Sequence, residues 1–211
     1  MHELGEIVLG LSIQVGGFEE QEIYESLSAA LVEAGLPPHS EPDIANDSEI
    51  FSCQMWGYSG LHYLRRLAAY LAAGQEVPGP GDDSSAEDPV LADFYDLLAP
   101  GFEHLLMHSD AEGFYAPLDF KDVIFPSEEL RVPGEMIGSS VQLLQECKRL
   151  AEWLELPLDL DPESDEVWDA ADSPQPDGPK WKQYGVESFS CMRLIKAAEA
   201  SIDSGAALVF C

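Results

Sequence analysis

The densest group of side chains that could do chemistry lies between His104 and Gly113. His104 and His108 fall on one face whether this segment is a helix or a strand, since four residues span about one helical turn and an even number of strand positions. Asp110 and Glu112 follow directly. Together these side chains would supply the nitrogen and oxygen ligands of a zinc, iron or manganese ion.

His62 is a candidate third imidazole ligand if the fold brings it to this pair. Leu105 stands where the general-base Glu of an H-E-x-x-H metalloprotease would be, so that enzyme class is not supported. The first hypothesis for the segment is therefore a divalent transition metal such as zinc or manganese, held by His62, His104, His108 and Asp110.

The favoured interpretation of this segment, to which the metal site is the alternative, is a turn that binds no cofactor. In that case both histidines pack at the margin of a sheet, while Ser109 and Asp110 bond turn amides and Gly113 takes a positive φ. The working surface for a partner would then be Ser109, Asp110, Glu112 and Gly113.

A second cluster combines glycines with arginines near the start of a predicted helix. Gly57, Ser59 and Gly60 would place backbone amides where an anion could bind, and Arg65 and Arg66 make this the least negative part of the chain. The G-x-x-G spacing lacks the third glycine of a dinucleotide fingerprint and the Lys-Ser/Thr of a phosphate loop. The pattern favours the alternative, a helix capped by Ser59 whose arginines pair with acidic neighbours.

Two segments resemble parts of one group of uncharacterised bacterial proteins. The stretch His104–Pro117 contains His-Ser-Asp-Ala-Glu-Gly before an aromatic pair and a proline, and is similar to their His-Ser-Asp-x-Asp/Glu-Gly segment. Tyr58–Ala68 is similar to another part of the same group. Some of these proteins belong to toxin–immunity settings, so the resemblance implies a cytoplasmic inhibitor of a toxin domain. It implies no reaction.

The elements that must position these residues are read from apolar periodicity and turn signals. Strands are predicted at Glu6–Val15, Glu49–Met55, Phe102–Ser109, Phe114–Phe120 and Ala206–Cys211. Helices are predicted at Phe18–Leu36, Ser59–Ala73, Val90–Leu98, from Ser139 or Ser140 to Leu154, and at Val186–Ser204.

The interleaved strands and helices predict an α+β fold, with α/β as the nearest alternative. We expect residues 1–211 to form a single domain, with helices packed on a mixed or antiparallel sheet of about five strands. The wholly apolar Ala206–Cys211 favours a central strand. Two stretches, 74–89 and 156–179, are acidic, rich in proline and without Lys or Arg, and are predicted to be solvated loops.

The charge of the chain is its strongest compositional signal, because 40 Asp and Glu against 10 Lys and Arg give a net charge of −30. Such a surface repels nucleic-acid phosphates and anionic lipid headgroups and attracts basic proteins. We therefore expect a basic protein partner, and neither nucleic acid nor membrane. There is no positively charged amino-terminal region, no apolar stretch of about 20 residues and no C-x-x-C pair, which favours the cytoplasm.

Two functions follow from these features. The favoured one is an acidic cytoplasmic protein-binding module without a cofactor, in the form of an immunity-like inhibitor of a basic partner. The alternative is a metal-dependent enzyme that uses the His/Asp/Glu group, because only a bound metal would let an anionic surface take an anionic substrate. Whether any reaction is catalysed stays open at this point.

Overall fold

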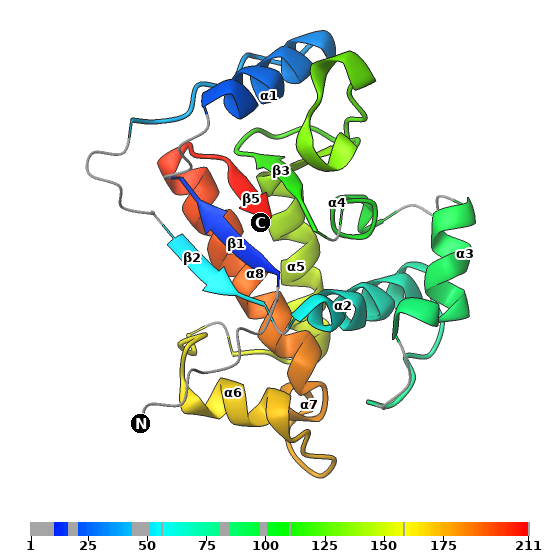
Figure 1. Ribbon diagram of the computed structural model, residues 1–211. Coiled ribbons are helices and arrows are strands. Elements are labelled where there is room, and N and C mark those ends of the chain that lie inside the picture. The colour runs from blue at the N-terminus through cyan, green and yellow to red at the C-terminus, as the bar shows by residue number, and fades with distance from the viewer. Residues whose placement is uncertain are drawn as a thin grey trace, which may run out of the picture.

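Five short strands form one sheet in the computed structural model, which describes residues 11–16, 21–43, 51–55, 57–80, 85–97, 101–109, 111–157 and 159–210 (Figure 1). The strands are β1 (Ser12–Val15), β2 (Phe51–Gln54), β3 (Gly113–Ala116), β4 (Ile137–Ser139) and β5 (Leu208–Phe210). Their order is β2-β1-β5-β3-β4, so the carboxyl-terminal strand is central, as its apolar sequence predicts. Three of the four neighbouring pairs are antiparallel and the pair β3–β4 is parallel, so the sheet is mixed.

The helices cover both faces of this sheet. They are α1 (Gln21–Glu33), α2 (Gly57–Ala72), α3 (Pro89–Leu97), α4 (Glu103–Leu106), α5 (Ser140–Leu154), α6 (Asp165–Asp172), α7 (Lys180–Gln183) and α8 (Gly185–Ser204). α5 and α8 pack against each other behind the sheet, and α1 lies across its other side (Figure 1). The fold is α+β, as the sequence predicts.

Alternate residues of the central strands point into two different hydrophobic clusters. Tyr115, Leu208 and Phe210 join the larger cluster with α2, α5 and α8. Phe114 and Val209 join the smaller cluster with α1. Because successive side chains of a strand point to opposite faces, a strand buried on both faces must be apolar throughout, which explains the sequence of β5.

The two longest helices begin and end where local signals place them. The Ser139 side chain accepts from Gln142 N at 3.2 Å and caps α5. α8 ends at Gly205, whose φ of 76° belongs to the left-handed region that glycine tolerates. α3 begins with Pro89, one residue before the predicted start, and Val90 N donates to Asp88 Oδ1 at 2.9 Å.

Two predicted elements and one predicted helix cap are wrong. Phe102–Ser109 is not a strand but contains the short helix α4, and the predicted loop 156–179 contains α6. Ser59 does not cap α2, because that helix already begins at Gly57. The predicted loop 74–89 is irregular from 75 to 80, and its end includes the 3-10 turn Ser85–Glu87, while residues 81–84 lie outside the described part.

The two wrong assignments at α4 and α6 have separate physical causes. α4 is held by polar groups that are distant in sequence, and the apolar stripe of α6 is only three residues wide and flanked by proline and acid. Among the described residues no helix is both long and apolar enough to cross a membrane.

Candidate functional site

Helix α6 presents an acidic face at one end of the molecule. Its apolar side, made by Val167, Ala170 and Ala171, is buried against the rest of the fold and packs on α8. The first residue of α8 is Gly185, where a Cβ would overlap the carbonyl oxygen of Ala170. The two helices therefore approach closely, which fixes the outer side of α6 toward solvent.

The outer side of α6 is a row of carboxylates. Asp165, Asp169 and Asp172 are exposed, and no ion pair to any of them occurs in the part of the chain that the structure describes. Glu166 is also exposed, but it pairs with Lys182 at 2.7 Å. We call Asp165, Asp169 and Asp172 the α6 acidic row.

The spacing of these charges approaches that of one DNA strand. At a rise of about 1.5 Å per residue, the α6 acidic row has axial steps of about 6 and 4.5 Å. With Glu166 included, α6 carries four carboxylates along about 12 Å, or one per about 3 Å. A DNA strand carries one phosphate per about 3.4 Å of helix axis.

Part of this row works against the stability of its own helix. Asp165 and Glu166 in the first turn favour the helix, because they face the positive end of its dipole. Asp172 lies at the negative end, where the last turn carries no basic residue, and Asp169 stands four residues from Asp165. Like charges at that spacing and acids at a carboxyl-terminal end destabilise a helix by a few tenths of a kcal/mol each, roughly. The stability of α6 therefore does not explain why positions 169 and 172 carry aspartates.

Three of the five arginine side chains are buried in the interior. Arg65 is 1 % exposed and donates to the carbonyl oxygens of Leu105, at 2.8 Å, and His108. Arg66 is buried beside Glu187, and Arg193 is fully buried with Glu163 at 2.7 Å. Arg65 and Arg66 thus bind internal carbonyls and the buried Glu187, whereas Arg193 pairs with the exposed Glu163, and none of the three pairs with the α6 acidic row.

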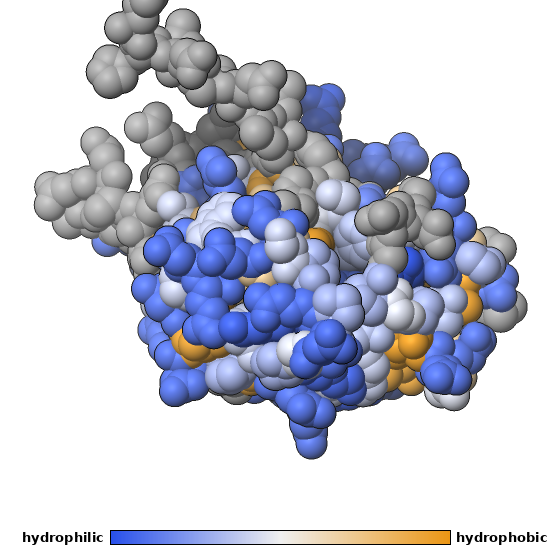
Figure 2. All heavy atoms as spheres, turned by 90° about the horizontal axis from the view of Figure 1, so that it is seen from below, coloured by the Kyte–Doolittle hydropathy of each residue, from blue (hydrophilic) through white to orange (hydrophobic). Residues whose placement is uncertain are grey.

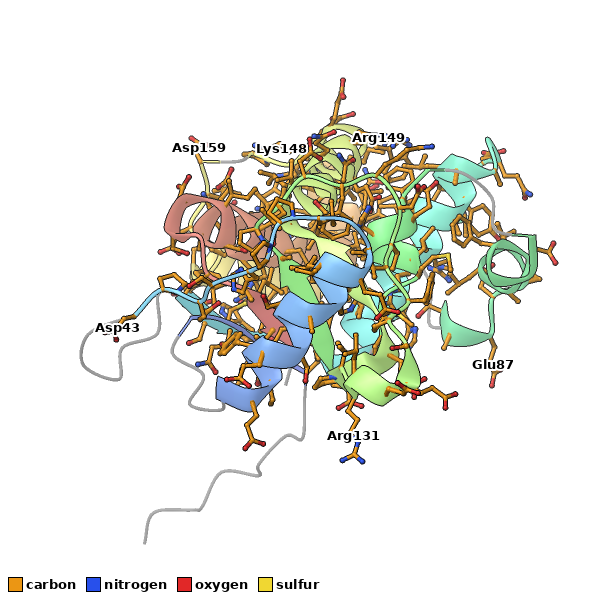
Figure 3. The ribbon with its side chains drawn as sticks, turned by 90° about the horizontal axis from the view of Figure 1, so that it is seen from above. Asp43, Glu87, Arg131, Lys148, Arg149 and Asp159 are labelled. Atoms are coloured by element: carbon orange, nitrogen blue, oxygen red, sulfur yellow. The ribbon has the colours of Figure 1, made fainter. Side chains whose placement is uncertain are left out.

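Other basic side chains lie over aromatic rings. Lys180 Nζ is 3.4 Å from the centre of the Trp153 ring, and the Arg149 guanidinium is 4.1 Å from that of Phe102. The face of the molecule on which α6 and α7 lie is largely hydrophilic, with small apolar areas (Figure 2). Exposed acids are not confined to this face, since Asp43, Glu87 and Asp159 point outward in different directions (Figure 3).

The predicted histidine pair is buried and engaged in hydrogen bonds. His104 Nδ1 accepts from Ser139 N at 2.9 Å, so Nε2 carries the proton and donates to Lys121 O at 3.0 Å. Burial lowers the pKa of His104, against the raising effect of that carbonyl. This imidazole ties α4 to β4 and to the loop before it.

His108 lies beyond the end of α4 and faces other groups. Its ring stacks on Tyr115 at 4.0 Å, with Nε2 2.9 Å from Phe114 O and Nδ1 3.2 Å from Ser109 O. Burial lowers the pKa of His108 to about 4, so the ring is neutral near pH 7 and donates to one of these carbonyls. The two imidazole rings therefore form hydrogen bonds with different backbone groups.

The residues after His108 form a turn. Ser109 Oγ lies 3.4 Å from Ala111 N and 3.5 Å from Glu112 N, and Glu112 is exposed. Gly113 has a φ of 123°, and a Cβ there would lie 2.9 Å from His108 Cε1, so glycine is required. Asp110 lies outside the described residues.

The glycine and arginine cluster does not converge on one place. Gly57 and Gly60 lie in the first turn of α2 and Ser59 is exposed between them, but Arg65 and Arg66 point into the interior as described above. Because both guanidinium groups are engaged with internal partners, they add no positive charge to an anion site at the helix start.

The predicted metal ligands stay a prediction. Among the described residues no three His, Cys, Asp or Glu side chains are grouped so as to hold a metal ion, and Asp110 is not among those residues. Both ring nitrogens of His104 already have protein partners, so metal binding would require breaking one of those bonds.

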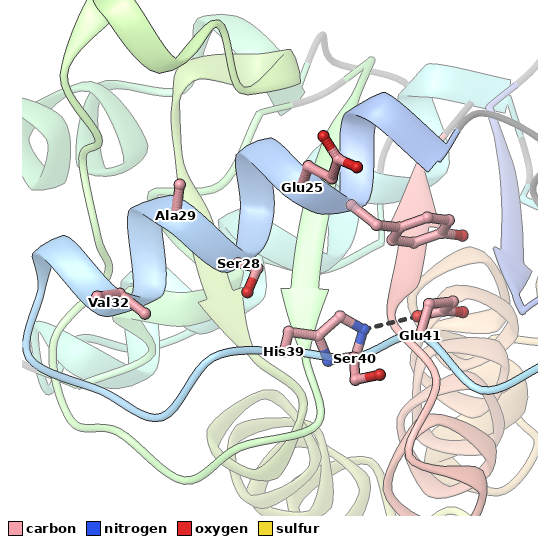
Figure 4. Close-up of a pocket in the computed structure, with 8 residues that line it drawn as sticks. Glu25, Ser28, Ala29, Val32, His39, Ser40 and Glu41 are labelled. Atoms are coloured by element: carbon pink, nitrogen blue, oxygen red, sulfur yellow. Dashed lines mark hydrogen bonds and ion pairs between the residues drawn. The ribbon is translucent and has the colours of Figure 1, made fainter.

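A hollow of about 660 Å³ lies beside α1 (Figure 4). Glu25, Ser28 and Val32 line it from the helix, opposite His39 and Glu41. His39 Nε2 lies 2.7 Å from Glu41 Oε2, and that oxygen also accepts from Ala207 N at 2.9 Å. Glu41 therefore ties the segment after α1 to the chain just before β5, which is a structural role.

An α+β domain with an acidic exterior and inward-facing arginines is an acidic protein-binding module. The model of a protein family described as "Putative DNA-mimic protein" matches residues 11–210, and the chain belongs to this family. Searches of curated proteins and of solved structures found no match.

This family corrects one expectation. We expected nucleic acid to play no part in the function, and that is wrong, because a DNA mimic interacts with proteins that bind DNA. The charge argument applies to direct binding, in which phosphates are repelled. It does not consider that the same carboxylates can take the place of the phosphates.

Sequence reasoning missed the α6 acidic row. The signal was present, since Ser164 precedes two acids and Val167, Ala170 and Ala171 follow at helical spacing. The acid content of 156–179 predicts a solvated loop, but acids on the outer side of a helix give the same composition.

Proposed function

We propose that this protein binds a DNA-binding protein and covers the basic surface which that partner uses for DNA. The α6 acidic row is the main contact, because its three carboxylates are exposed, form no ion pair within the described residues and follow one another at axial steps of about 4.5–6 Å, wider than the 3.4 Å between phosphates of one DNA strand but in a single line. This is the observation that carries the proposal, and membership of the DNA-mimic family supports it.

The basic character of the partner follows from this arrangement. Groups that bind phosphates are mainly Lys and Arg, and a carboxylate array attracts the same groups over long range, which raises the association rate. A nuclease toxin is itself a DNA-binding protein, so an immunity-like inhibitor of a basic toxin domain is one form of the proposal. DNA-binding proteins act where the cell keeps its DNA, so the proposal includes a cytoplasmic location.

The test begins with proteins of the native lysate that bind to a DNA resin and elute with salt. Those that the immobilised chain retains at low salt are purified, and the displacement of a fluorescent DNA duplex from each is measured by anisotropy. We expect the chain to displace the duplex, with an apparent affinity that falls as salt is raised.

The matched variants change three charges each. Replacing the α6 acidic row by Asn is expected to weaken displacement at least tenfold. Replacing Glu22 and Glu25 of α1 by Gln, together with Asp203 in the last turn of α8 by Asn, should change it little, because α1 and the last turn of α8 lie far from α6 (Figure 1). Equal effects of both variants would show that net charge alone attracts the partner, and retained proteins that keep their duplex would refute the proposal.

A further inference from the structure

Phe125 is one of two large apolar side chains that stand exposed in the described part of the chain, at 58 % exposure. It lines a hollow of about 530 Å³ formed by the segment between β3 and β4. Three carboxylates line the same hollow, those of Glu112, Glu128 and Glu135. The hollow therefore places one exposed aromatic ring and three carboxylates on the same small surface.

The rest of the molecule shows what such a combination holds. The Arg193 guanidinium lies 3.5 Å from the centre of the Phe189 ring and pairs with Glu163 at 2.7 Å. Lys182 lies over Trp181 and pairs with Glu166 in the same way. In both cases a cation sits between a ring face and a carboxylate, where both attract it.

Phe125 has no such cation from its own chain. All ten Lys and Arg residues belong to the described part, and none of them lies over this ring. Arg131 lines the hollow, but its side chain points away from the ribbon (Figure 3). The net charge of the side chains that line the hollow is negative, because they include three carboxylates and one guanidinium.

We propose that the hollow around Phe125 binds an arginine or lysine side chain of the partner protein, with the cation over the ring and the glutamates around it. The charge of the rim fits a basic segment, and the exposed ring supplies the apolar anchor that contact surfaces commonly use. The partner's basic nature rests on the proposed function. Residues 125–135, which line most of the hollow, and α6 lie at different ends of the molecule (Figure 1), so this is a second contact.

The probe is a fluorescein-labelled tetra-arginine peptide, and its affinity is measured by anisotropy at a fixed salt concentration near 150 mM. Phe125→Leu keeps the apolar bulk and removes the ring face, whereas Phe125→Tyr keeps the face. Since a cation–π contact at an exposed site is worth about a two- to fivefold change in affinity, Phe125→Leu should weaken binding by that factor and Phe125→Tyr should not. Val32→Ala, at the other exposed apolar side chain, is the control and should have no effect.

Wild-type affinity in Phe125→Leu would overturn the proposal, even if Glu128→Gln with Glu135→Gln weakened binding, because attraction would then come from carboxylates alone. Dimerisation of the wild type that is lost in Phe125→Leu would also overturn it and assign the hollow to a second copy. Duplex displacement that does not depend on the α6 acidic row refutes the proposed function without affecting the peptide result.

Discussion

Replacing Glu146 by Gln should change how the free energy of unfolding depends on pH. Glu146 is 5 % exposed on α5, and its two oxygens accept from His104 N at 3.1 Å and Leu105 N at 2.8 Å, in the first turn of α4. Burial raises the pKa of this carboxyl from 4.5 to about 7, although the two N–H groups and Arg149 lower it.

The sign follows from proton binding. Between pH 4.5 and 7 the folded protein holds a proton on Glu146 that the unfolded chain has lost, so the free energy of unfolding falls as pH rises through this window. A pKa difference of one is worth about 1.36 kcal/mol, and about 2.5 kcal/mol of the effect falls between pH 5 and 8.

His108 acts in the opposite direction. Its pKa is lowered from 6.5 to about 4, so the folded protein excludes a proton that the unfolded chain binds, and stability from this group rises between pH 4 and 6.5. The two groups largely cancel in the wild type. Glu146→Gln removes one of them, so the free energy of unfolding of the variant, relative to wild type, should increase by about 2.5 kcal/mol from pH 5 to 8.

Urea unfolding followed by circular dichroism at several pH values and constant ionic strength measures this difference. Glu152→Gln, an exposed change on the same helix, removes one carboxylate without burial and should run parallel to the wild type. A difference between Glu146→Gln and wild type that stays constant with pH would refute the reasoning, since the carboxyl would then titrate alike in both states.

Three further predictions concern stability, each measured by urea unfolding. Arg65→Met should cost about 3 kcal/mol or more, because two buried carbonyls at the end of α4 lose their donor, and a cost below about 1 kcal/mol would contradict this. Gly185→Ala should cost about 1–3 kcal/mol by forcing α8 away from α6, and a cost no larger than that of Gly79→Ala, where space is open and φ is not positive, would count against that close contact. Ser139→Ala should cost about 1–2 kcal/mol by removing the cap of α5, and a neutral result would show that the cap is replaceable.

The sequence predicts the elements whose signals are local. α5 has its capping serine and an apolar side at helical spacing, and β5 is apolar enough to be recognised as a central strand. α4 is different, because its N–H groups are satisfied by Glu146 and its carbonyls by Arg65, each about forty residues away in sequence. No local sequence pattern shows such distant partners. The apolar residues around His104 and His108 therefore predict a strand where the structure has a helix.

The same distinction applies to the site. Composition predicts a negative surface, but it does not predict which carboxylates remain unpaired, since that depends on where the cations lie. Lys182 and Arg193 reach Glu166 and Glu163 only because α7 and α8 pack beside α6. The three aspartates of the α6 acidic row are left over from that pairing, and only the fold identifies them.

The placement of the arginines is what turns an acidic protein into a surface that resembles DNA. Three guanidinium groups on the surface would form ion pairs with neighbouring acids, and such paired carboxylates would offer little to a basic partner. Arg65 and Arg66 instead bind internal carbonyls and the buried Glu187, and Arg193 pairs with Glu163, so none of the three pairs with the α6 acidic row. The carboxylates of the α6 acidic row are thereby left for the basic partner that we propose.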